Sequence, residues 1–360
     1  MATQKVLEEL QPYYLSEYLP NCSSNYSNPL ANPRFVKTTS YIIFIITTPI
    51  NLFGIYCIIF KSPIEMLTIK WCMLYLHVIA TFTSAWMTIG IAPFVFFPAC
   101  AGFTMGLLQD LRVPIEVQGY VAFGGLGMLA MSLPILFENR QRYLVDHYKI
   151  TRPASRTLFY MFNILFVPGS LLGPFSVIPE QKSARLLILQ QLPCPNPSYF
   201  HHHVFILSLD HIPITGYLCA LSSVTVAQIL FFGGHSLTYL AYGTKTTSRS
   251  TRKLQRRFFL VISTQLTLPC VILFIPVVFF IFSMFTGYYS QALNNICVLT
   301  LSLYGAIATL TMIILHNPYQ KFVRQLLKPM WRPRKPQPIE VKPRKWVRRN
   351  AVSLTTPVSF

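Results

Sequence analysis

The chain has 360 residues, of which 52% are hydrophobic and only 11% are charged, and its mean hydropathy is +0.46. Soluble domains carry roughly 25% charged residues, so this composition argues against a soluble multidomain protein, a disordered chain, a disulfide-dense secreted scaffold and a cytosolic enzyme. The net charge of +19 would indicate nucleic-acid binding in a soluble protein, but in a membrane protein it reports orientation instead.

Long stretches without Lys, Arg, Asp or Glu predict membrane-spanning helices, because a bilayer core requires about 20 mostly apolar residues in a helix. Residues 258–320 form one such stretch of 63 residues, about three hydrocarbon thicknesses long as a single helix, so it has to fold back. The polar patch 286–291 predicts the turn. Residues 186–209 are also uncharged but contain three prolines and three consecutive histidines, which favours a loop. Seven spans are predicted, at about residues 38–60, 71–95, 115–137, 157–179, 212–240, 258–285 and 291–315.

The predicted fold class is therefore an all-α membrane protein, a bundle of seven transmembrane helices. The connections between the spans decide its orientation, because cytoplasmic connections carry an excess of Lys and Arg. Alternate connections hold 24 Lys and Arg on one side and 6 on the other. This distribution predicts an extracellular N-terminal tail at residues 1–37, a transmembrane domain at 38–315, and a C-terminus inside the cell.

The N-terminal tail contains no apolar core typical of a cleaved signal peptide, so the first span is expected to act as its own insertion signal. The tail carries two N-x-S sequons, at Asn21 and Asn25. Such sequons also occur by chance, but both lie on the side predicted to be extracellular, which favours glycosylation.

Eight cysteines fall into two groups. Five lie in or at the ends of predicted spans and are expected to pack as small apolar side chains: Cys57, Cys72, Cys219, Cys270 and Cys297. Cys22, Cys100 and Cys194 lie in predicted extracellular segments, where disulfides persist. We expect Cys100 and Cys194 to form a bridge across the mouth of the bundle, with Cys22 left over; a free pair is the alternative, because connectivity cannot be deduced from sequence.

No pattern in the chain predicts an enzyme, a metal site or a cofactor. The histidines at 201–203 are consecutive and cannot easily converge on one ion. The glycine-rich run 124–127 lies inside the third predicted span with no strand before it, so it predicts close helix packing and not a nucleotide loop. The acids nearest the spans lie at span ends, which disfavours an ion-coupled carrier.

Several stretches share the pattern of one family, at both ends of several spans. They are Thr48 to Pro63, Ile69 to Trp71, Leu76-His77, Leu136 to Arg140, Leu192 to Pro195, Thr251 to Phe258 with Gln265, Pro269 and Pro276 beyond it, Gln291 to Asn295, and His316 to Tyr319. Over about residues 40–326 the chain resembles the class H serpentine receptors of nematodes, the Srh chemoreceptor family. The resemblance implies a seven-helix G-protein-coupled receptor in the plasma membrane of sensory-neuron cilia. Such a receptor binds a small-molecule ligand and activates a heterotrimeric G protein.

Glu138-Asn139-Arg140 stands at the predicted cytoplasmic end of the third span, where rhodopsin-like receptors carry an acid–Arg–Tyr lock. A carboxylate two residues from Arg140 is expected to hold an inactive arrangement that later releases the arginine toward a partner. The alternative is that Arg140 only anchors the helix at the positively charged side of the membrane.

The sixth span predicts a hinge. Pro269 and Pro276 lie seven residues apart, nearly on one face, and each removes a backbone hydrogen bond. A kink there would swing the basic inner end of the span, formed by Arg252, Lys253, Arg256 and Arg257, and open a cytoplasmic cleft. Proline is also simply common in membrane helices.

Beyond the last span, Pro318 and Tyr319 only loosely match the Asn-Pro-x-x-Tyr motif of rhodopsin-like receptors. Residues 316–331 alternate apolar and basic side chains, which predicts an amphipathic juxtamembrane helix on anionic inner-leaflet lipid. Residues 332–360 predict a basic, disordered cytoplasmic tail. Nucleic-acid binding is disfavoured because the tail is tethered to a membrane.

Six residues are predicted by depth to line a pocket in the outer half of the bundle: Trp86, Gln118, Tyr120, Tyr217, Phe279 and Asn294. No charged side chain lies in the outer halves of the spans, so a neutral organic ligand of modest size is expected. The alternative is a charged metabolite held by Glu116 or by the extracellular loops. The alternatives are a ligand-gated seven-helix channel, which the 24-to-6 distribution opposes, and a small-solute carrier. Assembly with a second receptor stays open.

Overall fold

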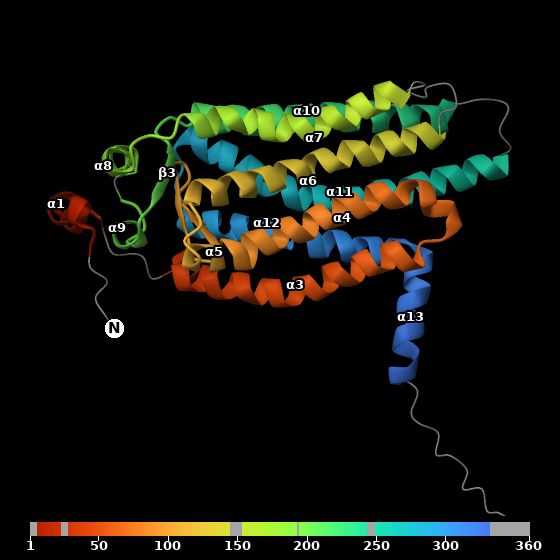
Figure 1. Ribbon diagram of the computed structural model, residues 1–360, viewed down its shortest axis with the longest axis horizontal. Coiled ribbons are helices and arrows are strands. Elements are labelled where there is room, and N and C mark those ends of the chain that lie inside the picture. The colour runs from red at the N-terminus through yellow and green to blue at the C-terminus, as the bar shows by residue number, and fades with distance from the viewer. Residues whose placement is uncertain (1–5, 23–27, 145–152, 193, 243–248, 332–360) are drawn as a thin grey trace, which may run out of the picture. The chain divides into compact units, whose positions relative to one another are not determined.

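The computed structural model describes residues 6–22, 28–144, 153–192, 194–242 and 249–331. The chain divides into a first unit, Met1–Lys321, and a second unit, Phe322–Phe360. Figure 1 shows the long helices of the first unit running side by side. Seven helices in the described residues are long and apolar enough to cross a membrane, which confirms the predicted seven-helix bundle. They are α3 (Pro33–Lys61), α4 (Leu67–Ala85, continued by a π-helical turn η5, Trp86–Gly90), α6 (Ile115–Leu144), α7 (Pro153–Ser176), α10 (Ile212–Tyr242), α11 (Arg249–Thr286) and α12 (Gln291–Leu315).

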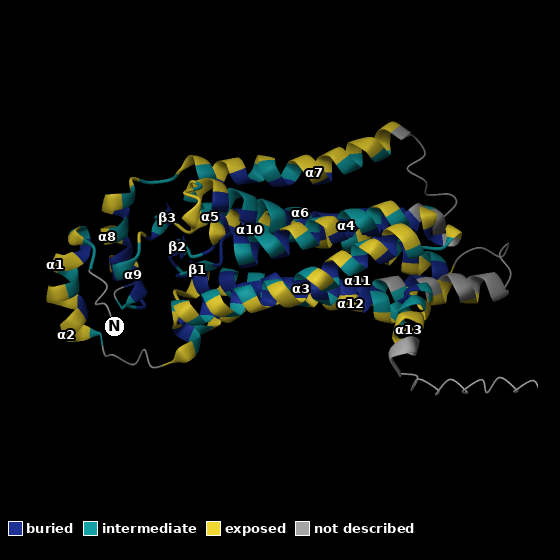
Figure 2. Cartoon of the chain, turned by 60° about the horizontal axis from the view of Figure 1, so that its bottom comes forward, coloured by how far each residue is buried: buried dark blue, intermediate teal, exposed yellow. Residues whose placement is uncertain are grey.

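Two helices form the centre of the bundle. Helix α6 packs against α4, α7 and α10, and helix α12 packs against α3, α4 and α11. These two helices bury the largest share of their apolar stretch, whereas α7 buries the smallest and presents exposed leucines such as Leu158 and Leu172. Figure 2 shows the same contrast along the helices. Exposed apolar side chains of this kind are expected where a helix faces lipid.

The glycine-rich run in α6 brings neighbouring helices close, as its position inside the third span predicts. A Cβ atom on Gly125 would lie 2.8 Å from Oγ1 of Thr83 in α4. A Cβ atom on Gly127 would lie 2.7 Å from both Oη of Tyr217 in α10 and Cγ1 of Val167 in α7. Three helices therefore approach α6 at positions that tolerate no side chain.

The turn predicted within residues 258–320 is confirmed. Helix α11 ends at Thr286 and α12 begins at Gln291, and Gly287 between them has a φ of 69°, a left-handed conformation that glycine adopts without a Cβ penalty. Helix α13 (Asn317–Trp331) occupies the region of the predicted juxtamembrane helix. The predicted tail at 332–360 lies outside the described residues.

A small antiparallel sheet, absent from the all-α prediction, lies at one end of the bundle. Its strands β1 (Pro93–Val95), β2 (Cys100–Thr104) and β3 (Phe205–Ser208) pair in that order, with Phe94 opposite Phe103 and Cys100 opposite Ser208. The prediction that the second span reaches residue 95 is wrong, because the helix ends at Gly90 and the chain turns into β1. We call this end the sheet end, and the opposite end, which carries Arg140, the Arg140 end.

Residues 186–209 are also more structured than the predicted loop. They contain most of helix α8 (Gln181–Gln191), helix α9 (Ser198–His201) and strand β3. Among the described residues of this stretch, the proline-rich sequence between Gln191 and Ser198, residues 202–204 and residue 209 form neither helix nor strand.

The described part of the N-terminal segment folds onto these elements. Residues 8–21 form short successive helical turns: η1 (Glu8–Leu10), α1 (Gln11–Tyr13), η2 (Tyr14–Tyr18) and α2 (Leu19–Asn21). Leu10 and Tyr18 are buried in one apolar cluster with Phe96, Tyr199 and Phe200. Segments 6–22, 93–104 and 181–208 thus share a hydrophobic core, and we refer to them together as the cap.

Candidate functional site

A cavity of about 190 Å³ lies beneath the sheet, inside the sheet end of the bundle. Five of the seven long helices and the π-helical turn after α4 contribute to its walls, and all three strands of the sheet form its roof. The lining side chains are almost entirely apolar. They include Met87 and Ile91 near η5, Ala122, Phe123, Leu126 and Ala130 of α6, Phe175 of α7, Tyr217, Leu218, Leu221, Ser222 and Thr225 of α10, Leu273, Phe274 and Phe280 of α11, and Val298 and Leu301 of α12.

The roof of the cavity is held to α12 by two side-chain amides. Asn294 Nδ2 donates to the carbonyl of Phe97 at 2.9 Å, and Gln291 Nε2 donates to the carbonyl of Val95 at 2.9 Å. The ring of Phe97 packs 4.5 Å from that of Phe280 in α11. Since Val95, Phe97 and Phe280 all line the cavity, these contacts couple the roof directly to the last two long helices.

A histidine stacks against the roof. The imidazole of His202 lies 4.2 Å from the ring of Phe103, a roof residue, with an interplanar angle of 13°. Burial, followed by the neighbouring His201 and His203, lowers the pKa of His202. The three histidines belong to no metal cluster within the described parts of the chain, and one of them serves here as a flat packing surface.

The polar groups of the cavity are few, and most of their hydroxyl protons are already engaged. Tyr217 Oη donates to the carbonyl of Phe123 at 3.2 Å. Thr225 Oγ1 donates to Sδ of Met131 at 3.7 Å, and Thr104 Oγ1 donates to Oε1 of Gln109 at 3.1 Å. The cavity can therefore offer these groups mainly as acceptors.

The predicted bridge between Cys100 and Cys194 is wrong. Cys194 instead forms a disulfide with Cys22, with Cα atoms 5.6 Å apart, and Cys100 carries a free thiol in strand β2, where it lines the cavity. Burial, with a smaller contribution from the charge of Asp210, raises the pKa of Cys100 to about 12. The prediction failed because the N-terminal segment folds onto the 181–208 segment and brings Cys22, the cysteine treated as left over, to Cys194.

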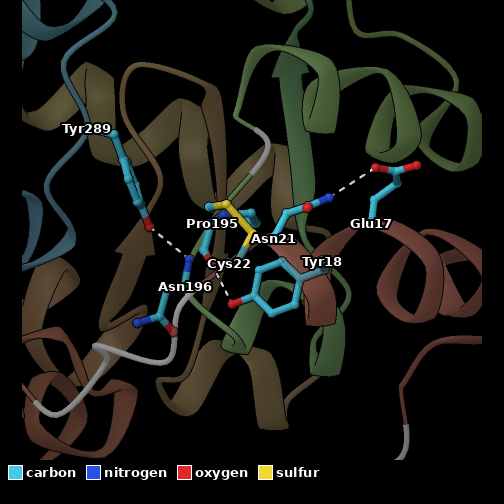
Figure 3. The surroundings of a disulfide bond; sticks show 8 residues. Glu17, Tyr18, Asn21, Cys22, Pro195, Asn196 and Tyr289 are labelled. Carbon is cyan, nitrogen blue, oxygen red and sulfur yellow. Dashed lines mark hydrogen bonds between the residues drawn. A yellow bond between two sulfur atoms is a disulfide. The ribbon is translucent and has the colours of Figure 1, made fainter.

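The disulfide lies among hydrogen bonds that join distant segments (Figure 3). Tyr18 Oη donates to the carbonyl of Pro195 at 2.9 Å, and the backbone N–H of Asn196 donates to Oη of Tyr289 at 3.0 Å. Earlier in the same two segments, Arg185 forms an ion pair with Glu9. The N-terminal segment, the 181–208 segment and the α11–α12 turn are thus bound into one structure over the cavity.

Of the six side chains predicted to line the pocket, only Tyr217 does so. The other five lie behind or beside the lining. Gln118 and Asn294 are fully buried supports, since Gln118 Nε2 donates to the carbonyl of Val113 and Asn294 holds Phe97. Trp86 Nε1 donates to the carbonyl of Gln118, Tyr120 Oη donates to that of Pro168, and Phe279 packs against Phe280. The depth of each residue along its helix was predictable from the sequence, but the direction of its side chain depends on how the helices pack.

At the Arg140 end, Glu138, Asn139 and Arg140 are all buried. Glu138 pairs with a different arginine from the one predicted: its Oε1 lies 3.5 Å from Nε of Arg156 in α7, and its Oε2 accepts from Tyr160 at 2.9 Å. Arg156 also donates to Oδ1 of Asn139 at 2.9 Å. The predicted Glu138–Arg140 lock is therefore wrong in its partner, because residues two apart on a helix point to opposite faces.

The His-Asn-Pro-Tyr sequence after α12 joins three helices. His316 Nε2 lies 2.6 Å from Oε1 of Gln265 in α11, and both side chains are buried. Tyr319 Oη lies 2.8 Å from Oγ of Ser62 at the end of α3. Pro318 lies between these two contacts, in the first turn of α13.

Comparison with known proteins identifies the family of this chain. Residues 31–329 match the family model described as serpentine type 7TM GPCR chemoreceptor Srh. The chain belongs to the Srh family. It is similar to serpentine receptor class H-72 of Caenorhabditis elegans, with 24% identity over 330 residues that cover 88% of this chain and 92% of the relative. Its fold is similar to that of squid rhodopsin, with a TM-score of 0.55 and 11% identity over 84% of this chain and 87% of the other.

Within this Srh chain, the predicted hinge residues lie in an unbroken helix. Both Pro269 and Pro276 are buried inside α11. The predicted basic end of α11 is exposed at Lys253, Arg256 and Arg257, whereas the side chain of Arg252 lies outside the described residues.

Only one of the two predicted glycosylation sites lies among the described residues. Asn21 is exposed at the end of α2, and its Nδ2 donates to Oε2 of Glu17 at 3.3 Å. Asn25 lies outside the described residues. Glycosylation of both stays a prediction.

Sequence reasoning missed three features of this Srh chain: the roof strands, the pairing of Glu138 with Arg156, and the hydroxyl of Ser222 in the cavity wall. The sequence held one signal for the partners of Glu138. Arg156 and Tyr160 are four residues apart, and side chains at that spacing share a helix face.

Proposed function

We propose that this protein is a chemosensory G-protein-coupled receptor that binds a small neutral molecule in the cavity beneath the sheet. The observation that carries this proposal is an apolar cavity in a seven-helix bundle whose fold is similar to that of squid rhodopsin. Largely apolar pockets with a few polar groups are typical small-molecule sites. The walls come from helices that also reach the Arg140 end, so occupancy of the cavity can bias the arrangement at both ends.

The proposed orientation places the sheet end outside the cell. It is supported by the 24-to-6 distribution of Lys and Arg in alternate connections and by the disulfide in the cap, because disulfides persist in oxidising compartments. The Arg140 end would then face the cytoplasm, with the exposed Lys253, Arg256 and Arg257 available to a heterotrimeric G protein and to anionic inner-leaflet lipid. The plasma membrane of sensory-neuron cilia is the proposed location.

Activation in this proposal separates α11 from its neighbours at the Arg140 end. The hydrogen bond between His316 and Gln265 holds α11 against the α12–α13 junction. Ligand contact with Phe280 or Leu273 in the same helix would shift the equilibrium toward a state in which this bond is broken. The buried prolines of α11 lie between the two sites and would serve as the hinge.

The test combines topology and signalling in one cell line. An epitope tag at the N-terminus is labelled on intact cells while G-protein activation and membrane current are recorded during an odorant panel. Leu126→Trp fills the cavity, and Leu172→Trp is the matched control on an exposed face of α7. External labelling with G-protein activation that L126W abolishes and L172W retains supports the proposal. An internal tag, or a current that persists when G proteins are blocked, refutes it in favour of a channel.

A further inference from the structure

We propose that the cavity beneath the sheet selects neutral, hydrocarbon-rich molecules that carry a single oxygen, and that Ser222 is the residue that binds this oxygen. The inference rests on the proposed function only in treating the cavity as a ligand site. It adds the chemical class of the ligand and the residue that determines it.

The walls exclude a charged ligand. None of the described side chains that line the cavity is an Asp, Glu, Lys, Arg or His. A carboxylate or an ammonium group inside would lose its hydration without gaining a counter-ion, which strongly disfavours its binding. A neutral molecule with an apolar frame loses little and gains the contacts of the apolar walls.

The other polar groups of the cavity are poor partners for a ligand acceptor. The hydroxyl protons of Tyr217, Thr225 and Thr104 already go to protein acceptors. The thiol of Cys100 is free, but a thiol is only a weak donor. A ligand carbonyl or ether oxygen therefore finds no strong donor among these four side chains.

Ser222 differs from them. It lines the cavity from α10, one turn before Thr225, and is half-buried. Its hydroxyl makes no hydrogen bond with the described residues, although helix serines commonly donate to a carbonyl one turn back, as Ser236 does to Phe232 in the same helix. A hydroxyl can both donate and accept, so Ser222 can bind a carbonyl, an ether or an alcohol.

The volume sets the size of the ligand. An engineered apolar cavity of about 150 Å³ holds benzene, a molecule of six non-hydrogen atoms. The cavity here is larger, at about 190 Å³, and in proportion accommodates a ring with a short substituent, about eight non-hydrogen atoms in total. Aromatic ketones and alcohols of this size are suitable probes.

The experiment measures binding without a G protein. The full-length receptor in phosphatidylcholine nanodiscs is titrated with acetophenone, ethylbenzene and benzoate, and binding is followed by ligand-observed NMR with empty discs as the blank for partition into lipid. Acetophenone and ethylbenzene are expected to bind and benzoate is not. Ser222→Ala is expected to weaken acetophenone by roughly twofold to tenfold, the factor for one neutral hydrogen bond, and to leave ethylbenzene unchanged.

Two variants separate this role from a general effect on folding. Ser222→Thr keeps a hydroxyl and is expected to retain the preference for acetophenone. Ser170→Ala removes a hydroxyl from α7 that donates to Val167 and does not line the cavity, and it is expected to change neither affinity. Benzoate binding as tightly as acetophenone, equal acetophenone affinity for the wild type and S222A, or no binding by any probe to the folded receptor would each overturn the inference.

Failure of the proposed function would look different. Binding that depends on Ser222 with no G-protein activation by the same probes in cells would refute the signalling role and leave the ligand class intact. G-protein activation by charged compounds alone would support the signalling role and overturn the ligand class.

Discussion

The ion pair between Glu138 and Arg156 predicts that removing one partner destabilises the protein more than removing the other. At 3.5 Å two unit charges attract by about 5 kcal/mol with an effective dielectric constant of about 20, and this gain is offset by the loss of hydration. The two partners differ in exposure, because 24% of the Arg156 side chain but only 2% of the Glu138 side chain is exposed. Removing one partner should therefore cost more than removing the other.

Arg156→Met leaves a buried carboxylate with Tyr160 as its remaining partner, and a loss of about 3–5 kcal/mol in the free energy of unfolding is expected. Glu138→Gln leaves an arginine that can extend its head group toward lipid phosphates and water, and the expected loss is about 1–2 kcal/mol. Arg142→Met removes a half-buried charge from the same end of α6 and is the control. We expect it to change stability by less than about 0.5 kcal/mol.

Thermal unfolding of the purified protein in one detergent measures these differences, on a scale of roughly 1–2 °C per kcal/mol for a chain of this length. The double variant Arg156→Met/Glu138→Gln should be more stable than the sum of the single losses predicts, by about 0.5–3 kcal/mol. If E138Q lowered the midpoint more than R156M did, or if both matched R142M, the argument from burial would be refuted.

Three further predictions concern the cap and the residues that follow strand β2. Non-reducing peptide maps should link Cys22 to Cys194, and Cys22→Ser should match Cys194→Ser in the protease sensitivity of the N-terminal segment; a peptide that links Cys194 to Cys100 would contradict the structure. Maleimide should label Cys100 slowly in the folded protein at pH 8, since a pKa of about 12 leaves about one thiol in 10,000 ionised. The stability that burial of the neutral thiol contributes should be lost as the pH rises above about 9. Fast labelling of the peptide that contains Cys100 at pH 8 would count against a buried thiol. Gly106→Ala should destabilise by about 1–3 kcal/mol, because its Cβ would clash with the carbonyl oxygen of Gly90. Gly169→Ala has open space around it and should be neutral. Equal melting temperatures for the two variants would refute the close backbone approach.

The spans were predictable because lipid restricts the composition of a spanning helix so strongly. A run free of charges marks each helix, and the polar patch at 286–291 marks the turn between α11 and α12. The end of the second span was not predictable in the same way. The sequence from Ile91 to Phe97 is as apolar as a helix, and it forms part of a sheet because β3, about 100 residues later, completes that sheet through β2.

The candidate site was less predictable than the fold. Its polar residues depend on which face of each helix turns inward, so that Tyr217 was identified whereas Ser222, five residues further along α10, was not. The disulfide partner of Cys194 and the ion-pair partner of Glu138 depend on contacts between segments far apart in the chain. Proximity in sequence, as between Glu138 and Arg140, was misleading in this case.

The construction of the cap limits how receptors of this kind can be recombined. Cys22 with Cys194, Glu9 with Arg185 and Tyr18 with Pro195 each pair a position in the first 22 residues with a position in the 181–208 segment. A chimera whose new N-terminal segment lacked partners for Cys194, Arg185 and Pro195 would leave an unpaired thiol and lose contacts over the cavity. The two segments therefore form one exchangeable module, although about 160 residues and four of the seven helices separate them in the chain.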